Sequence, residues 1–181
     1  MLNKDFKYPD TAAFDFVVDG LKKRGVDLHQ LSGIAYDLQH NFVPTITQEE
    51  CYQELLNVLH KRELLNNAMV ALELDRLAEE GQIKEPLLTI IRNDAGVFGV
   101  DEALALQTAN IYGTIGVTNF GYLDRVKYGI IKQYDEDNDQ VNTFIDDLLG
   151  AIVAALCGKL AHKYASVSYT HLRAHETELH L

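Results

Sequence analysis

The sequence predicts an all-α protein that folds as a single-domain helical bundle, and three observations support that class. Apolar residues recur every three or four positions through almost the whole chain, which is the period of a helix buried on one face. No pair of segments carries the turn residues and alternating pattern of a β-hairpin. The 181 residues are 47% hydrophobic and 24% charged, which suits one globular domain rather than a disordered chain.

The first half of the chain is expected to form three helices. The apolar spacing and end signals predict one helix over residues 10–24 and a second that opens at Asp27. Pro44 then interrupts the helical pattern. A capping-box sequence, Thr-Gln-Glu-Glu, begins a single long helix over residues 47–81, with a kink near Asn66.

The second half is expected to contain more helices separated by glycine-bearing turns. A short helix follows Pro86, and a longer one is predicted over residues 101–112. Glycines punctuate residues 113–121, which predicts a loop or an irregular helix, and another helix is predicted over residues 122–134. Thr143 is placed to cap the final helix.

That final helix is predicted to be the central one. Gly150, Ala154 and Gly158 recur every fourth residue, so neighbouring helices can approach it closely. Its most apolar run, Leu148 to Cys157, is about half the length of a membrane span and indicates a buried helix instead.

Charge and cysteine usage restrict the possible partners and the compartment. The formal net charge is −11, with 16 basic against 27 acidic residues, which argues against nucleic acid as a partner. Cys51 and Cys157 lack a CxxC pattern and are expected to be reduced thiols. The first ten residues carry no secretory signal. We therefore expect a cytoplasmic protein, with contact at the inner face of the membrane left open. A homo-oligomer is compatible with the sequence.

The last residues, 167–181, are expected to be non-native. The run VSYTHLRAHET, which starts at Val167, is what a transposase-end sequencing adapter encodes when it is translated. The native domain is then expected to span residues 1–166, and the native C-terminus to be missing. Three histidines fall in this segment and are not interpreted as metal ligands: His171, His175 and His180.

Five acidic residues in the second half are the main candidates for a functional site. They are Asp101 and Glu102, Asp124, and Asp146 with Asp147. The last pair stands against an apolar, small-residue helix, where carboxylates are costly without a compensating partner. Several carboxylates from separate segments are what a hard divalent cation prefers. The sequence therefore predicts a metal site where these segments meet.

Each candidate also has a structural explanation. Acidic residues at helix starts are favoured by capping and by the helix dipole, and Asp124 can pair with Lys127 one turn later. Lys61 and Arg62 are either a phosphate clamp or partners of nearby carboxylates. The acidic stretch that begins at Asp135 resembles a calcium loop but lacks the required glycine, so a solvated loop is expected. The remaining candidate histidines are expected at the surface or at helix ends: His40, His60 and His162.

The quoted motifs GVDEALAL, NIYGTIGVTNFGYLD and FIDDLLGAIVAA, together with KRELLNNAMVALELDRLAEEG, resemble the phosphatidylglycerophosphatase A family, in particular its small branch from Gram-positive bacteria. The resemblance implies a helical fold with a central helix. It also implies Mg²⁺-dependent hydrolysis of phosphatidylglycerophosphate to phosphatidylglycerol and phosphate, with Mn²⁺ as the alternative ion.

The resemblance assigns roles to individual residues. The five carboxylates correspond to the family's metal-binding motifs; Asp124, Asp146 and Asp147 are expected to be catalytic as well. Lys127 is expected to bind the substrate, and Lys61 and Arg62 are further candidates. The sequence departs from the family in lacking its N-terminal GTxGS loop and membrane-spanning helices. Two alternatives follow: a phosphatase of a soluble phosphomonoester, and a catalytically silent helical binding or regulatory domain.

Overall fold

The computed structural model describes residues 5–137 and 139–178, with side chains as far as Ala165. Within these residues the structure contains nine α-helices, one short 3-10 helix and no strand, so the predicted all-α class is confirmed. In chain order the elements are α1 (Asp10–Lys23), α2 (Leu28–Gln39), α3 (Gln48–Leu59), α4 (Arg62–Glu79), α5 (Leu87–Arg92), α6 (Val100–Ala109), η1 (Asn110–Tyr112), α7 (Thr114–Val126), α8 (Ile130–Glu136) and α9 (Ile145–Glu178).

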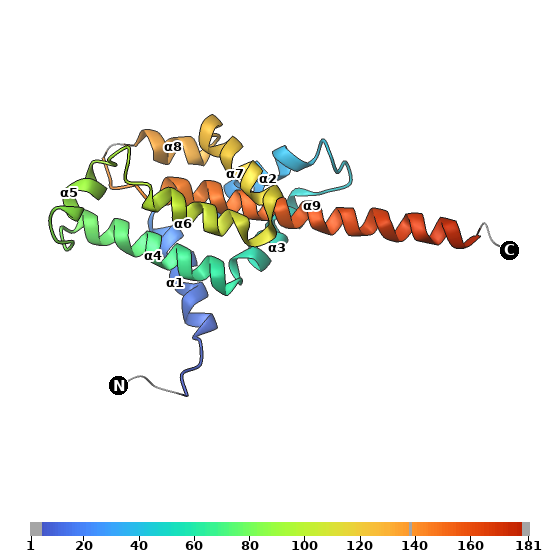
Figure 1. Cartoon of the computed structure of the whole chain (residues 1–181), viewed down its shortest axis with the longest axis horizontal. Coiled ribbons are helices and arrows are strands. Elements are labelled where there is room, and N and C mark those ends of the chain that lie inside the picture. Colours follow the sequence, from blue (N-terminus) through green and yellow to red (C-terminus); the bar gives the residue numbers. More distant parts are fainter. Residues whose placement is uncertain (1–4, 138, 179–181) are drawn as a thin grey trace.

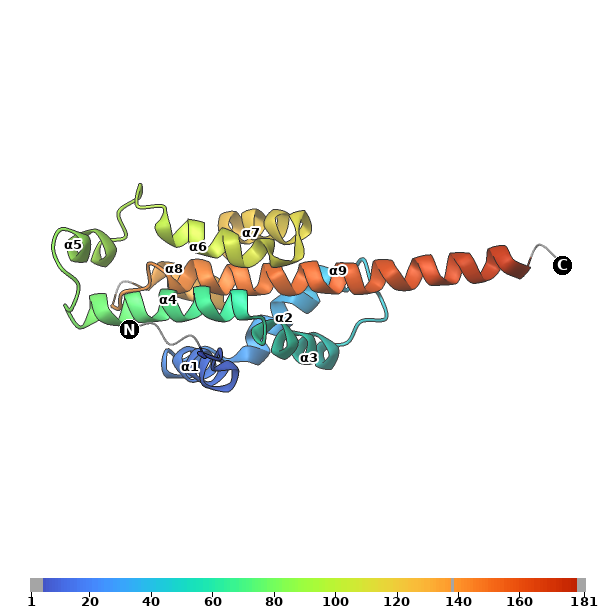
Figure 2. The same cartoon turned by 60° about the horizontal axis from the view of Figure 1, so that its bottom comes forward.

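Helix α9 is the centre of the bundle, as its small-residue pattern predicts (Figures 1 and 2). It packs against α2, α3, α4, α6, α7 and α8. Every residue from Leu148 to Gly158 is buried, which accounts for the helix lacking a polar face in this part. Beyond the bundle, the C-terminal part of α9 extends past the other helices in both views.

Two glycines allow α7 to approach α6 and α9 closely. A Cβ added to Gly116 would lie 2.0 Å from the Ala109 carbonyl oxygen, and one added to Gly158 would lie 3.0 Å from the Tyr112 Cβ and 3.3 Å from the Gly116 nitrogen. No side chain fits at the first position without moving backbone. Gly116 therefore serves helix packing. The structure has a helix, α7, from Thr114 onward, where a loop or an irregular helix was expected.

The prediction of one long helix over residues 47–81 is wrong. Thr47 does cap α3 by accepting the Glu50 N–H, but the chain breaks at His60 and Lys61 and restarts as α4. Asn66, where a kink was expected, lies inside α4 rather than at the break. The break has a packing reason, because α3 lies on α2 and α9 while α4 lies on α1 and α6.

A second correction concerns the predicted helix over residues 122–134. The structure divides this segment into the end of α7 and the start of α8. Lys127 and Gly129 between them have positive φ angles of 47° and 57°, a conformation that ends a helix. This turn determines where Lys127 points.

Thr143 is not the cap of the final helix. Its hydroxyl donates instead to the Ile91 carbonyl oxygen at 2.6 Å, which ties the start of α9 to α5. The acceptor for the first amides of α9 comes from Asp75 of α4.

Two further findings bear on the sequence predictions. Within the ranges that the structure describes, no helix combines the length and the apolar character needed to cross a bilayer. The α9 backbone is helical to Glu178, but the side chains of the segment predicted to be non-native lie outside the described residues, as do those of its three histidines.

Candidate active site

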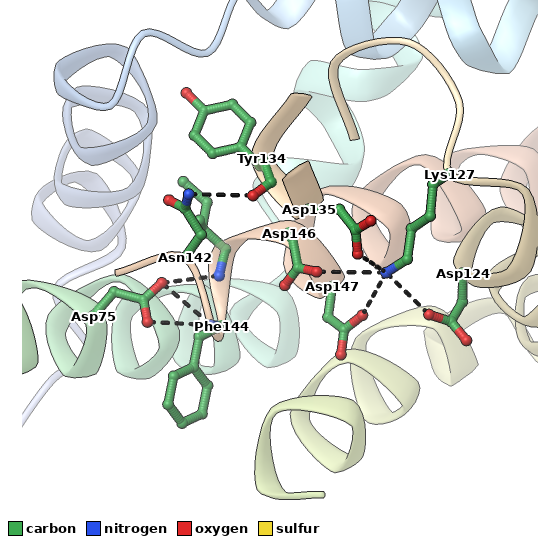
Figure 3. Close-up of polar contacts among 10 residues, drawn as sticks. Asp75, Asp124, Lys127, Tyr134, Asp135, Asn142, Phe144, Asp146 and Asp147 are labelled. Atoms are coloured by element: carbon green, nitrogen blue, oxygen red, sulfur yellow. Dashed lines mark hydrogen bonds and ion pairs between the residues drawn. The ribbon is translucent and has the colours of Figure 1, made fainter. Parts of the chain in front are cut away.

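The Lys127 ammonium group lies among four carboxylates (Figure 3). Its Nζ atom is within ion-pair distance of oxygens from Asp124 (3.1 Å), Asp135 (3.2 Å), Asp146 (3.4 Å) and Asp147 (3.7 Å). Three helices contribute these groups: the last turn of α7, α8 and the first turn of α9. The lysine thus joins segments that are up to 20 residues apart in sequence.

Local structure explains how Lys127 reaches this position. It follows α7 directly and adopts a left-handed conformation as the C-cap, while its amide donates to the Leu123 carbonyl oxygen at 2.8 Å. The side chain lies three residues after Asp124, a spacing that brings both groups to one face. At 20% exposure the Lys127 side chain is largely shielded from water, so its ion pairs are stronger than surface pairs.

The second wall of the site comes from the α5–α6 loop and the start of α6. Asp94 lies in the loop with a positive φ of 43°, and Asp101 and Glu102 lie in the first turn of α6. Together with the residues around Lys127 they enclose a pocket of about 340 Å³. Its lining residues are Asp94, Ala95, Gly96, Val97, Phe98, Gly99, Asp101, Glu102, Asp124, Lys127, Asp135, Thr143, Asp146 and Asp147.

Asp101 differs from the other carboxylates. It is only 8% exposed, and its Oδ1 atom is buried without a hydrogen-bond partner among the described residues. A buried, unpartnered carboxylate oxygen is unfavourable and normally has a donor or a cation near it.

The electrostatics of the pocket reflect burial of like charges. Burial raises the pKa of Asp146 to about 6, with Lys127 opposing the rise. Burial, and then the charge of Asp146, raise the pKa of Asp147 to about 7. Burial alone would lower the pKa of Lys127, but the carboxylates, Asp146 first, outweigh it and raise the pKa. The pKa of Asp94 is also raised, by burial and by Asp101.

The structure brings all five sequence-predicted carboxylates, and Lys127, to one pocket. Two further acidic residues of this pocket, Asp94 and Asp135, were not predicted as site residues. Asp135 belongs to the acidic stretch that was interpreted as a solvated loop, but it lies on α8 and pairs with Lys127. Asp94 precedes the glycine-bearing turn, and its unusual backbone conformation is the feature that marks it in the structure.

Lys61 and Arg62, the two further substrate-binding candidates, do not line this pocket. Arg62 forms an ion pair with Asp10 at 2.7 Å and lies over the Tyr8 ring. Arg62 is the first residue of α4, whereas Asp75, which contacts the start of α9, lies 13 residues or about 20 Å further along the helix.

The three candidate histidines lie where the sequence places them: His60 and His162 are exposed, and His40 ends α2. His60 stacks on Phe14 with 4.0 Å between ring centroids, and His162 contacts the Tyr112 carbonyl oxygen. In the acidic stretch, Asp137 accepts the amide of Asp139, as in an ordinary polar turn.

The pocket is lined by carboxylate oxygens, the ligand type that hard divalent cations prefer, but four of these carboxylates surround an ammonium group. Among residues 5–137 and 139–165, no three His, Cys, Asp or Glu side chains stand in an arrangement that would hold a metal ion. The Nζ atom of Lys127 lies at the point where four carboxylates converge. The all-carboxylate donor set and the unpartnered Asp101 oxygen nevertheless match the preference of Mg²⁺ and Mn²⁺.

Fold and pocket together define a class: an all-α protein with a carboxylate-rich pocket at the N-terminus of a buried central helix. The chain belongs to the phosphatidylglycerophosphatase A family, whose model matches residues 21–162. Membership of this family implies a phosphatase.

Similar proteins come from Bacillus subtilis and Listeria monocytogenes. The uncharacterized protein YpjQ of Bacillus subtilis is 39% identical over 158 residues, covering 87% of this chain and 89% of YpjQ. The uncharacterized protein YutG of the same organism is 42% identical over 144 residues, covering 79% of this chain and 87% of YutG. The crystal structure of the low temperature requirement C protein from Listeria monocytogenes matches with a TM-score of 0.81 and 41% identity, covering 85% and 98% of the two chains.

Proposed function

We propose that this protein is a Mg²⁺-dependent phosphomonoesterase that hydrolyses phosphatidylglycerophosphate to phosphatidylglycerol and phosphate. The observation that carries the proposal is the pocket itself, which is lined by one lysine and by carboxylates from the α5–α6 loop and from helices α6, α7, α8 and α9. The family description supplies the substrate class.

The charge of the pocket supports the need for a cation. Seven carboxylates line it and Lys127 is the one basic side chain among the lining residues. A phosphate monoester carries up to two negative charges and would be repelled by this arrangement. The groups assigned to hold Mg²⁺ are Asp101, Glu102, Asp124, Asp146 and Asp147. When bound, the ion supplies positive charge and Lewis acidity to the phosphate.

The chain's own groups then have separate tasks. Lys127 donates from Nζ to a phosphate oxygen and stabilises the charge that develops there. Asp124, Asp146 and Asp147 lie around the same Nζ, so each is placed to accept a proton from an attacking water. Asp124 is the most accessible of the three, with 47% of its side chain exposed.

Phosphate release from phosphatidylglycerophosphate tests the proposal. We expect Mg²⁺-dependent release by the wild-type protein, and a loss of at least about 100-fold in Asp147→Asn and Asp101→Asn. Asp139→Asn, an exposed acidic position outside the pocket, is the matched control and should retain activity. Unchanged release in Asp147→Asn would rule out the assigned chemistry.

Calorimetric titration with Mg²⁺ and Mn²⁺ tests the ion separately. Heat of binding and a raised unfolding temperature are expected for the wild-type protein. Absence of both effects would contradict the metal dependence and favour a catalytically silent domain.

A lipid substrate requires contact with a membrane surface, and one pocket residue supports this. Val97 lines the pocket and is 98% exposed, an arrangement that suits insertion of an apolar side chain beside a lipid headgroup. Val97→Ser is expected to lower phosphate release from lipid vesicles but not from glycerol 3-phosphate. Val70→Ser, on an exposed part of α4, is the control. Equal effects on both substrates would indicate a soluble phosphomonoester instead.

A further inference from the structure

Asp75 is a buried carboxylate outside the pocket that contacts the start of α9. It lies on α4 and is 1% exposed. Its oxygens accept the amide of Phe144 at 3.1 and 3.3 Å and the amide of Ile145 at 2.9 Å (Figure 3). These two amides directly precede the acidic pair Asp146 and Asp147.

Among the described residues, no side chain next to the start of α9 along the chain accepts the amides of Phe144 and Ile145, which bond to Asp75 instead. The first amides of a helix lack partners within the helix and are usually capped by the residue just before it. That residue is Phe144, which has no acceptor, and the hydroxyl of Thr143 is engaged with Ile91. Asp75 therefore caps α9 from another helix, 69 and 70 residues away in sequence.

Long-range capping has a different consequence from local capping. A local cap moves with its own helix, whereas Asp75 fixes the first turn of α9 relative to α4. A second buried hydrogen bond, from Asn67 Nδ2 to Thr108 Oγ1 at 3.1 Å, links α4 to α6 in the same way. Since α6 also carries Asp101, α4 backs two walls of the pocket without lining it.

We infer that Asp75 is a positioning residue for the phosphatase reaction. By holding the amides of Phe144 and Ile145, it fixes the direction in which Asp146 and Asp147 leave the helix and so keeps both carboxylates beside Lys127. It does not touch the substrate. The expected effect on the reaction rate rests on the proposed function. The expected effect on the order of the start of α9 rests on the hydrogen bonds alone.

Three variants test this role with phosphatidylglycerophosphate in detergent micelles. Asp75→Ala is expected to lower kcat and to raise the Mg²⁺ concentration for half-maximal rate, each by about 10- to 100-fold, as for other residues that orient metal ligands. KM for the substrate should change by less than about twofold, because substrate contacts remain. Asp75→Asn keeps one acceptor oxygen and should recover part of the loss.

Ser32→Ala is the control for stability. Ser32 is buried on α2, a helix that does not line the pocket, and its hydroxyl donates to the His29 carbonyl oxygen at 3.1 Å. Loss of this bond should lower the unfolding temperature while leaving the Mg²⁺ dependence at the wild-type value. If folded Asp75→Ala also shows wild-type kcat and Mg²⁺ dependence, Asp75 is only structural and the inference is wrong.

Amide hydrogen exchange separates this inference from the proposed function. In Asp75→Ala, exchange at Phe144, Ile145 and the following turn is expected to rise by at least about tenfold relative to Ser32→Ala. Unchanged exchange would overturn the positioning role. A wild-type protein that releases no phosphate would refute the proposed function, while the exchange result would still decide whether Asp75 orders the start of α9.

Discussion

Lys127 combines a constrained backbone with a concentrated charge. Its left-handed conformation ends α7 and directs the side chain to the start of α9. There the ammonium group compensates carboxylates that would otherwise repel one another. We therefore expect both the proposed activity and the stability of the metal-free protein to depend on this residue.

Replacing Lys127 by alanine is expected to destabilise the protein in EDTA, lowering Tm by about 3–10 °C, because four carboxylates lose their common cation. Added Mg²⁺ should recover much of the loss by taking over part of that charge. Thermal unfolding with and without Mg²⁺ measures both effects. Lys132→Ala, an exposed lysine of α8, is the control, and equal shifts in the two variants would contradict the prediction.

The acidic pair makes stability depend on pH. The pKa of Asp147 is raised from 3.8 to about 7, so between these values the folded state retains a proton that the unfolded state has released. Stability of the metal-free protein therefore falls as pH rises through this window. Asp147→Asn should be more stable than wild type at pH 8 in EDTA, with the difference shrinking towards pH 4.

Urea unfolding at several pH values measures this dependence, with Asp139→Asn as the control for a removed surface charge. A constant difference between Asp147→Asn and wild type across the range would show that the carboxyl does not titrate as described.

Prediction from sequence succeeded for those residues whose chemistry is visible locally. The DE and IDD motifs marked four pocket carboxylates because acidic residues stand out at helix starts and beside an apolar helix. The capping role of Asp75 could not be predicted from the sequence. One acidic residue in an amphipathic helix pattern does not reveal whether the folded protein exposes it or buries it. Its burial depends on α9 packing against α4.

At the scale of elements, the path of α7 shows where sequence reasoning was incomplete. Glycines are weak helix formers, so residues 113–121 were expected to be irregular. Packing outweighs that preference, because only a residue without Cβ fits at Gly116 between Ala109 and α9. Helix propensity depends on a residue and its neighbours in the chain, whereas the close approach of two helices depends on residues that are distant in the sequence.

A pair of glycine variants in α7 tests this explanation. Gly116→Ala is expected to lower the free energy of unfolding by about 2–4 kcal/mol, since the new methyl group would meet the Ala109 carbonyl oxygen. Gly121→Ala has nothing within 4 Å of its added Cβ, so it should stabilise the helix by up to about 1 kcal/mol. Urea unfolding distinguishes them, and equal changes would remove the packing argument.

At the scale of the whole molecule, ion pairs attach the far part of α9 to α3. Glu54 lies 2.7 Å from Lys159 and 2.8 Å from Lys163. Burial alone would raise the pKa of Glu54, but the hydrogen bonds from the two lysines outweigh it and lower the pKa to about 2. A lowered carboxyl pKa stabilises the fold above the unfolded value of 4.5, and this stabilisation is lost as pH falls towards 2.

Glu54→Gln should therefore lower the free energy of unfolding at pH 7 by about 1–3 kcal/mol and flatten its decline between pH 4.5 and 2. Glu49→Gln, an exposed position on the same helix, should leave the free energy of unfolding and its dependence on pH unchanged. Urea unfolding between pH 2.5 and 7 is the measurement, and parallel curves for wild type and Glu54→Gln would contradict the assigned pairing.

The all-α class, the central position of the small-residue helix and five of the seven pocket carboxylates could be predicted from the amino-acid sequence. These follow from periodicity, capping and motif, which depend on residues within about one turn of each other. The folded structure was needed to show that α7 and α8 separate at Lys127, that Asp94 and Asp135 join the pocket, and that Asp75 caps α9. These features arise from contacts between distant segments, and such contacts exist only after the helices have packed around α9.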